Sequence, residues 1–140
     1  MKALAMITLA TMMATAAPAQ TYFGNVQAHP ASDLTTAAAR YMESFRIDNE
    51  GVVGSALAHA VWIKLMRPDM PFTDLQAKVN ALAQTAPTVD LRSRARLASL
   101  VFDAPEMFKG IGSMEFAGDA ELFAAVAGRM SYSLLEKKEK

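Results

Sequence analysis

The chain has 140 residues, no cysteine, and 14 basic against 14 acidic side chains. The balanced charge excludes a general binder of nucleic acids or anionic membranes, which needs a basic surface, and the lack of cysteine excludes disulfides as a source of stability. We therefore expect one packed core to hold the fold, which a domain of this size can supply.

Residues 1–19 have the three parts of an export signal. Lys2 gives a positive start, residues 3–16 form an apolar run, and Ala17-Pro18-Ala19 has the pattern of a signal-peptidase site. The run is shorter than the ~20 residues of a membrane span. A buried N-terminal helix is the alternative. The sequence predicts a bacterial protein that is periplasmic or secreted, begins at Gln20 after cleavage, and has no membrane anchor.

The mature chain begins with a predicted extended arm over residues 20–31. Gly24, Asn25 and Pro30 disfavour a helix there, and the arm has few apolar residues. Removing the signal peptide takes away one Lys and no acid, so the mature chain has a formal net charge of −1.

The first helix is predicted over residues 33–47, with Ser32 as its N-cap. Apolar residues recur there every three or four positions, which places them on one face of a helix. The single helical domain is predicted to extend from residue 32 to residue 135.

The second helix is predicted over residues 50–66 and begins after Asn49 or Asp48 as its cap. Apolar side chains surround it on nearly all sides, which is typical of a central helix. Gly54 and Ala58 lie one turn apart, so a neighbouring helix can approach closely. Trp62 is predicted to be buried against such a neighbour.

The third helix is predicted to open with the capping box Thr73-Asp74-Leu75-Gln76 and to end before Pro87. The fourth is predicted over residues 89–102, capped by Thr88. A short helical turn then leads to Lys109.

The last helix is predicted over residues 119–135, followed by a charged tail at 136–140 that frays in solvent. No segment alternates with period two, so no strand is expected. The sequence thus predicts an all-α fold.

The second and fourth helices superpose with an offset of 39 residues. The matched pairs are Asn49 with Thr88, Val52 with Leu91, Ala56 with Ala95, and Ile63 with Phe102. The pattern resembles HEAT-type helical repeats, whose units are about 40 residues long. The resemblance covers residues 33–102 and implies a scaffold or partner-binding role. Two architectures stay open: two HEAT-like helical hairpins plus a C-terminal helix, or a compact five-helix bundle.

The sequence contains no catalytic set, metal-ligand spacing or phosphate loop. Its two histidines, His29 and His59, are not spaced as zinc ligands, and three protein ligands are typical of a catalytic zinc site. Gly110-Ile111-Gly112 is too short to hold a phosphate. We expect no enzyme activity and no cofactor.

Three arginines of the fourth helix point in two directions. Arg92, Arg96 and Asp103 form a stripe that is either a solvated face or a partner-binding face. Arg94 lies among apolar positions, where an unpaired charge is costly. It is therefore predicted to form a structural ion pair with Asp48 or Glu50, with Glu43 as a further candidate.

These observations together predict an exported, non-enzymatic helical domain that binds another envelope protein or acts as a scaffold. No nucleic-acid partner is expected. The alternative is a periplasmic protein that handles a small ligand or a metal, using His59 or the N-terminal arm.

Overall fold

The computed structural model of the chain describes residues 22–139. Within that range it contains five α-helices and no strand, which confirms the predicted all-α, five-helix fold. The predicted signal peptide of residues 1–19 lies outside the described residues.

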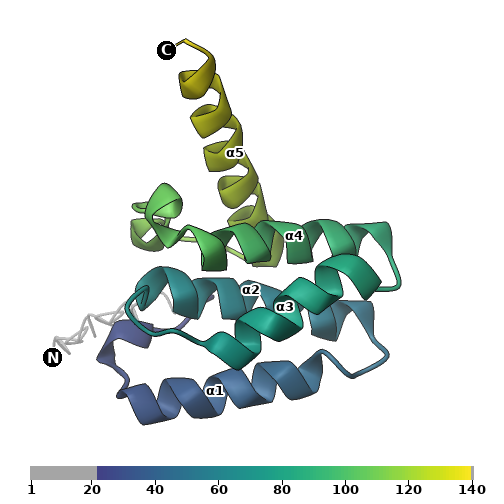
Figure 1. Cartoon of the computed structure of the whole chain (residues 1–140). Helices are drawn as coiled ribbons and strands as arrows, with labels where there is room; N and C mark the ends of the chain where they lie inside the picture. Colours follow the sequence, from purple (N-terminus) through teal and green to yellow (C-terminus); the bar gives the residue numbers. More distant parts are fainter. Residues whose placement is uncertain (1–21, 140) are drawn as a thin grey trace, which may run out of the picture.

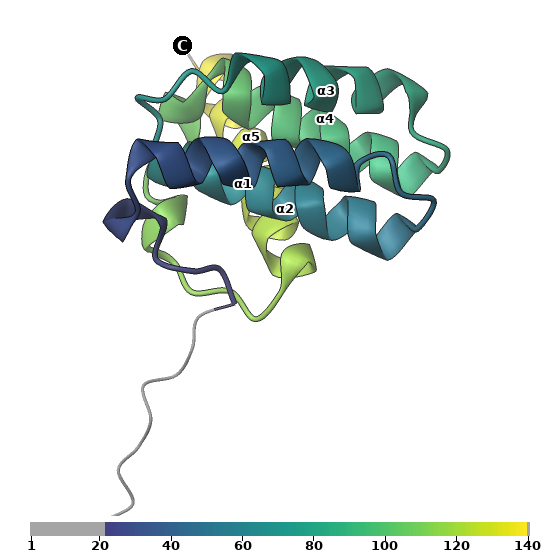
Figure 2. The ribbon, with the colours of Figure 1, turned by 90° about the horizontal axis from the view of Figure 1, so that it is seen from below.

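The first four helices form two antiparallel hairpins that lie side by side (Figures 1 and 2). Their bounds are α1, Ala31–Ser44; α2, Glu50–Met66; α3, Thr73–Thr85; and α4, Val89–Asp103. α2 lies between α1 and α4 and contacts both, so it is the central helix, as its apolar sequence predicts. Whether the hairpins form a HEAT-type repeat stays a prediction.

Two of the predicted caps are confirmed. The side chain of Asn49 accepts a hydrogen bond from the Val52 backbone N–H at the start of α2, and that of Thr88 accepts one from the Leu91 N–H at the start of α4. Each bond satisfies a backbone donor that the first turn of a helix leaves without a partner.

Two other predicted helix starts are wrong. α1 begins directly after Pro30, so Ser32 lies inside the helix and makes no cap; proline suits this position because it has no N–H to satisfy. The N-cap position of α3 is Phe72, in the left-handed region at φ 43°, and not Thr73. Gln76, the expected partner in the capping box, donates to Asp103 instead (2.8 Å).

Small residues allow close packing between α2 and α4. Ala58 of α2 and Ala95 of α4 are fully buried. A Cβ atom on Gly54 would lie 3.2 Å from the Nη1 atom of Arg94 on α4. The predicted close approach of a helix at Gly54 and Ala58 is therefore confirmed, and that helix is α4.

The sequence predicted an extended arm, but the arm is not extended throughout. Residues Val26–Ala28 form the 3₁₀ helix η1, and the side chains of Phe23 and Val26 are buried in the core. The burial of Phe23 and Val26 explains this, because both side chains are removed from water when the arm packs on the body.

The C-terminal part comprises two 3₁₀ helices, η2 (Pro105–Phe108) and η3 (Ile111–Ser113), and α5 (Asp119–Lys138). α5 begins where the sequence predicts but continues through the charged residues as far as Lys138, so most of the predicted tail is helical. Its second half projects away from the four-helix body (Figure 1). None of the helices in residues 22–139 is long and apolar enough to cross a membrane.

Candidate functional site

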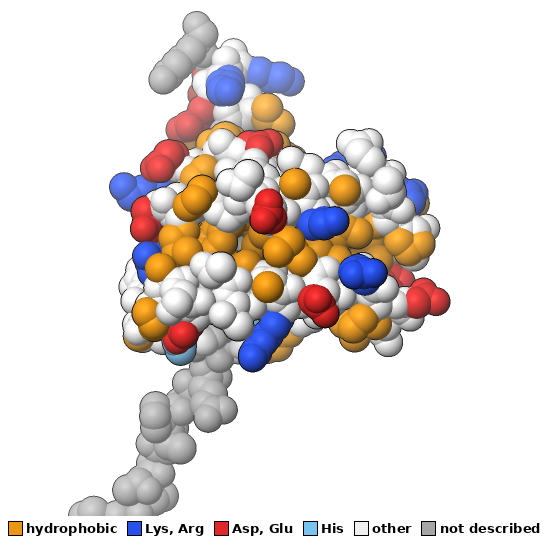
Figure 3. Space-filling view, turned by 60° about the horizontal axis from the view of Figure 1, so that its bottom comes forward, with side chains coloured by type: hydrophobic (Ala, Val, Ile, Leu, Met, Phe, Trp, Pro, Cys, Tyr) orange, Lys and Arg blue, Asp and Glu red, His pale blue; other side chains and the backbone are white. Residues whose placement is uncertain are grey.

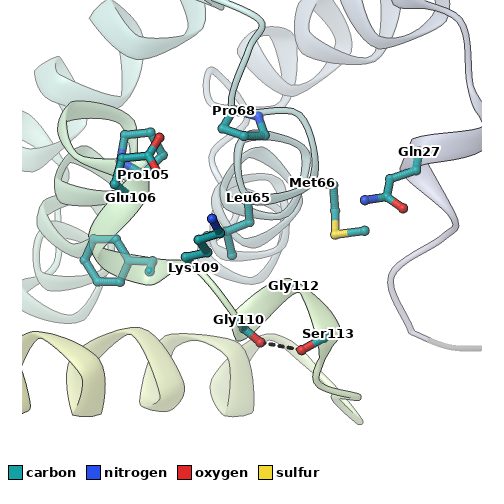
Figure 4. Close-up of a pocket in the computed structure, with 11 residues that line it drawn as sticks. Gln27, Leu65, Met66, Pro68, Pro105, Glu106, Lys109, Gly110, Gly112 and Ser113 are labelled. Atoms are coloured by element: carbon teal, nitrogen blue, oxygen red, sulfur yellow. Dashed lines mark hydrogen bonds between the residues drawn. The ribbon is translucent and has the colours of Figure 1, made fainter.

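A groove runs over the surface at the C-terminal end of α2. It consists of two adjoining cavities of about 460 and 200 Å³, which share Met66, Gly112 and Ser113 as lining residues. Both cavities are open to solvent. Figure 4 shows the larger one, with α2 on one side and the 105–113 segment on the other. We call the pair the Met66 groove.

A buried lysine shapes the α2 side of the Met66 groove. The Nζ atom of Lys64 donates hydrogen bonds to the carbonyl oxygens of Pro68 (3.2 Å) and Met70 (2.8 Å), and the side chain is only 6% exposed. Burial lowers the pKa of Lys64 below its ordinary value. The two bonds fix the chain where it turns out of α2, and so fix Pro68 at the edge of the groove.

Glycines shape the opposite side. Gly110 has a φ of 96°, which side chains rarely adopt. A Cβ atom on Gly112 would lie only 2.9 Å from the sulfur of Met66. Gly112 therefore allows η3 to approach the end of α2, and the hydroxyl of Ser113 closes the turn by donating to the Gly110 carbonyl oxygen (2.7 Å).

The larger cavity has apolar walls and a polar rim. The apolar side chains come from α2, the α2–α3 turn and η2: Leu65, Met66, Pro68, Pro105 and Phe108. The polar ones are Gln27, Glu106, Lys109 and Ser113. Because the rim carries both signs of charge, it does not favour a strongly acidic or a strongly basic ligand.

The smaller cavity is lined by three aromatic rings that hold the arm in place. Phe23 stacks on Trp62 with 5.1 Å between ring centroids, and Phe116 meets Trp62 edge-on at 6.1 Å. The indole N–H of Trp62 donates to the carbonyl oxygen of Gly24 (3.2 Å). Trp62 is 7% exposed. Its predicted burial is confirmed, but the rings against it belong to the arm and a loop and not to a neighbouring helix.

His59 is half-buried in a second aromatic cluster. Its ring lies 5.0–5.9 Å from the rings of Tyr22, Phe23 and Tyr41, and its Nδ1 atom lies 2.8 Å from the Ser55 carbonyl oxygen. Burial raises the pKa of Tyr41. A cavity of about 500 Å³ beside His59 is more open than the Met66 groove.

Metal-binding groups are not gathered anywhere in residues 22–139: no three His, Asp or Glu side chains lie close enough together to hold an ion. His29, the histidine of the arm, lies 3.7 Å from Asp33 at the start of α1, and both are exposed.

The ion pair of Arg94 differs from the predicted one. Its Nε atom pairs with Asp90 on the same helix (3.0 Å), and not with Asp48 or Glu50. The guanidinium also lies 5.6 Å from the ring centroid of Phe123 on α5. The spacing of residues within α4 shows on which face of the helix Arg94 lies, but it does not identify the partner. Asp90, one turn earlier on the same helix, reaches Arg94 without any tertiary contact.

Glu50 still joins α2 to α4, by a different bond. Its Oε1 atom accepts a hydrogen bond from the hydroxyl of Thr88, the cap of α4 (3.0 Å). Asp48 is exposed in the α1–α2 turn. The predicted link between the start of α2 and α4 therefore exists, but without Arg94.

The stripe of Arg92, Arg96 and Asp103 is partly used inside the domain. Arg92 donates to the Ala86 carbonyl oxygen (2.7 Å), and Asp103 accepts from Gln76 of α3. Arg96 is exposed. Two of the three side chains thus help join α3 to α4, and the role of this face in binding a partner stays a prediction.

The Met66 groove was missed by sequence reasoning. It is built from segments about 40 residues apart, and local periodicity contains no information about their contact. In the sequence, Gly110 and Gly112 were considered only as a phosphate loop, for which the segment is too short. The only signal in the sequence that this segment approaches another element closely was the presence of two glycines next to apolar residues.

Comparisons of the chain with protein-family models, with curated proteins and with solved structures gave no match.

Proposed function

We propose that this protein is an exported, non-enzymatic helical domain that binds a segment of another envelope protein in the Met66 groove. The observation that carries the proposal is the groove itself: two adjoining open cavities with apolar walls, a mixed-charge rim and a methionine at their junction.

The openness of the groove favours a protein partner over a small molecule. Sites for small ligands typically enclose roughly 70–90% or more of the surface of the ligand. A groove open to solvent leaves one side of its occupant uncovered, which suits a segment that belongs to a larger molecule.

The chemistry of the walls suits an extended or turning segment with a few apolar side chains. Met66 lies at the junction of the two cavities, and the unbranched side chain of methionine adapts its shape to different apolar neighbours. Gln27 and Ser113 at the rim can exchange hydrogen bonds with the backbone of such a segment.

The alternative, a small-ligand or metal-handling protein that uses His59 or the arm, has less support. The Nδ1 atom of His59 is engaged with a backbone carbonyl, and its ring packs among three others. Both features give the histidine a structural role.

A peptide selection tests the proposal. A random decapeptide library displayed on phage is selected on the mature domain and on the Ser113→Trp variant, whose indole would fill the groove. We expect peptides rich in apolar residues that bind the wild type and not the variant. Ser44→Trp, beside the His59 cavity, is the matched control and should bind normally.

Two results would contradict the proposal: no enrichment over an unrelated helical domain, or selected peptides that still bind Ser113→Trp. Nuclear magnetic resonance shifts should map a selected peptide to residues 62–66 and 105–116. Export is tested separately, because the intact mass of secreted or periplasmic material should correspond to a chain that starts at Gln20.

A further inference from the structure

A further cavity lies between the segment that follows η2 and the middle of α5. Its volume is about 440 Å³, and it is open to solvent. Residues 109–114 form one wall, and residues 125–132 of α5 form the other. We call it the Arg129 cavity. It shares Lys109 and Gly110 with the larger part of the Met66 groove.

Two basic side chains, Lys109 and Arg129, line the Arg129 cavity, and no acidic side chain lines it. Within residues 22–139 the ion pairs are those of His29, Arg67 and Arg94, so neither basic group of the cavity has an acidic partner there. Both positive charges are therefore available to a ligand.

The acids that flank these two residues in the sequence do not line the cavity. Glu106 and Glu115 line the two parts of the Met66 groove instead, and α5 has no acid between Glu121 and Glu136. On the face of the molecule that Figure 3 shows, by contrast, basic and acidic side chains are interspersed. The cavity is thus a local concentration of positive charge on a chain whose total charge is near zero.

Arg129 is held in position by the body of the domain. Its Nε atom donates a hydrogen bond to the carbonyl oxygen of Met107 in η2 (3.1 Å). This bond leaves the N–H groups of both Nη atoms for a ligand, and a side chain that is already oriented loses less freedom on binding. Tyr132, three residues later, lines the same cavity and adds a hydroxyl donor.

The remaining lining is apolar or has no side chain. Ile111, Met114 and Ala125 supply the apolar part. Gly128 lies within α5, where glycine stabilises a helix less than alanine does. A Cβ atom on Gly128 would meet nothing within 4 Å, so no packing contact requires a glycine there. Its effect on the structure is to leave the cavity open.

We propose that the Arg129 cavity binds a phosphate monoester that is carried on an apolar group. Such a phosphate has a charge of about −1.5 to −2 at pH 7, which two unpaired cations match. Its terminal oxygens can accept hydrogen bonds from Arg129, Lys109 and Tyr132. A carboxylate has one charge and two oxygens, so it would match this set less fully. The apolar lining suits the group to which the phosphate is attached.

This chemistry has two sources, a soluble phosphate monoester and the headgroup of phosphatidic acid, a lipid with the same terminal phosphate. The test below separates them. The proposal does not rest on the function proposed above, because the phosphate binds between residues 109–114 and α5 whether or not a peptide occupies the Met66 groove.

Phenyl phosphate serves as the soluble probe, titrated into the mature domain and followed by nuclear magnetic resonance. We expect saturable shifts at residues 109–114 and 125–132, with a dissociation constant of about 1 mM or lower. Arg129→Gln should weaken binding by about tenfold or more. Arg40→Gln, which removes the same charge from an exposed position on α1, is the matched control and should bind as the wild type does.

Gly128→Phe is a second variant, needed because Arg129→Gln also removes the bond to Met107. It keeps both cations and fills the cavity with a ring, and the space around Gly128 admits a side chain. We expect it to abolish binding while circular dichroism shows an intact helical fold. Unchanged binding by Gly128→Phe, or an equal loss in Arg40→Gln and Arg129→Gln, overturns the site. Benzoate that binds as tightly as phenyl phosphate overturns the assignment of the ligand.

Flotation with lipid vesicles identifies the source of the phosphate. Phosphatidylcholine vesicles that contain phosphatidic acid are compared with vesicles that contain phosphatidylglycerol, whose phosphate is a diester. Binding to the first kind alone, lost in Arg129→Gln, supports the lipid headgroup, and binding of phenyl phosphate without binding to vesicles supports a soluble ester. Equal binding to both kinds of vesicle, or no binding in either assay, overturns the proposal.

Discussion

α2 and α5 are the two longest helices of the described chain, and they are used in opposite ways. Ten of the 17 residues of α2 are buried, against three of the 20 residues of α5. α2 is covered by α1, α4 and the arm, whereas the buried residues of α5 all lie in its first half. The comparison teaches that the buried core of the domain is concentrated around α2, while most of the surface of α5 remains exposed.

The sharpest test of this comparison is Trp62→Ala in α2. Removing the indole deletes the ring on which Phe23 stacks and the hydrogen bond to Gly24. We expect a loss of ~3–5 kcal/mol in the free energy of unfolding, as for other buried aromatic residues. Urea denaturation measures it, with Trp62→Phe as the milder control. A loss below about 1 kcal/mol would show that the arm adds little to the fold.

A second test compares two leucines within α5. Leu122 is fully buried and Leu135 is 63% exposed. Leu122→Ala should cost ~2–5 kcal/mol, whereas Leu135→Ala should stay within about 0.5 kcal/mol of the wild type. Both losses are measured by urea denaturation. Equal losses would mean that the end of α5 packs on the body.

A third test uses the pH dependence of stability that Lys64 of α2 should cause. Because its pKa is lowered in the folded state, the folded chain releases this proton at a lower pH than the unfolded chain, whose value is near 10.5. Stability should therefore rise with pH between the lowered pKa and 10.5. The stability difference between wild type and Lys64→Met should move in favour of the wild type as the pH rises through the lowered pKa of Lys64 towards 10.5. If the stability difference between the two proteins does not change with pH, the pKa of Lys64 is not lowered in the folded state.

The smallest expected effect concerns Asp90 and Arg94. Their ion pair lies within one helix and is partly exposed, with 28% of the Arg94 side chain accessible. A double-mutant cycle with Asp90→Asn and Arg94→Met should give a coupling of about 0.3–0.5 kcal/mol. A coupling of several kcal/mol would show that Arg94 is effectively buried, as the sequence had suggested.

The parts of the structure that depend on local pattern could be predicted from the sequence. The bounds of α2, its cap Asn49, the cap Thr88 and the start of α5 all follow from side chains within four residues of each other. The unusual turn at Phe72 could not be predicted, because a non-glycine residue at positive φ is held there by tertiary packing.

The candidate site could not be predicted, for a related reason. The contact between Met66 and Gly112 joins elements that the sequence separates by 46 residues. The partner of Arg94 was wrongly predicted because only acids on neighbouring helices were considered, whereas Asp90 lies one turn earlier on the same helix. The burial of Phe23 was missed because the few apolar residues of the arm show no helical or strand periodicity.

The docking of the arm has a consequence for the order in which the domain folds. Phe23 contacts Phe116, and Tyr22 interacts with Asp119, whose hydrogen bond and charge raise the pKa of the tyrosine. The arm has nearer partners in α2, where Phe23 stacks on Trp62 and the Trp62 indole donates to Gly24. Its contacts with Phe116 and Asp119, by contrast, join the two ends of the domain, so the docking of the arm is complete only after the 105–119 segment has packed on α2. The attachment of the arm closes the longest loops in the fold, so we expect it to be a late step of folding.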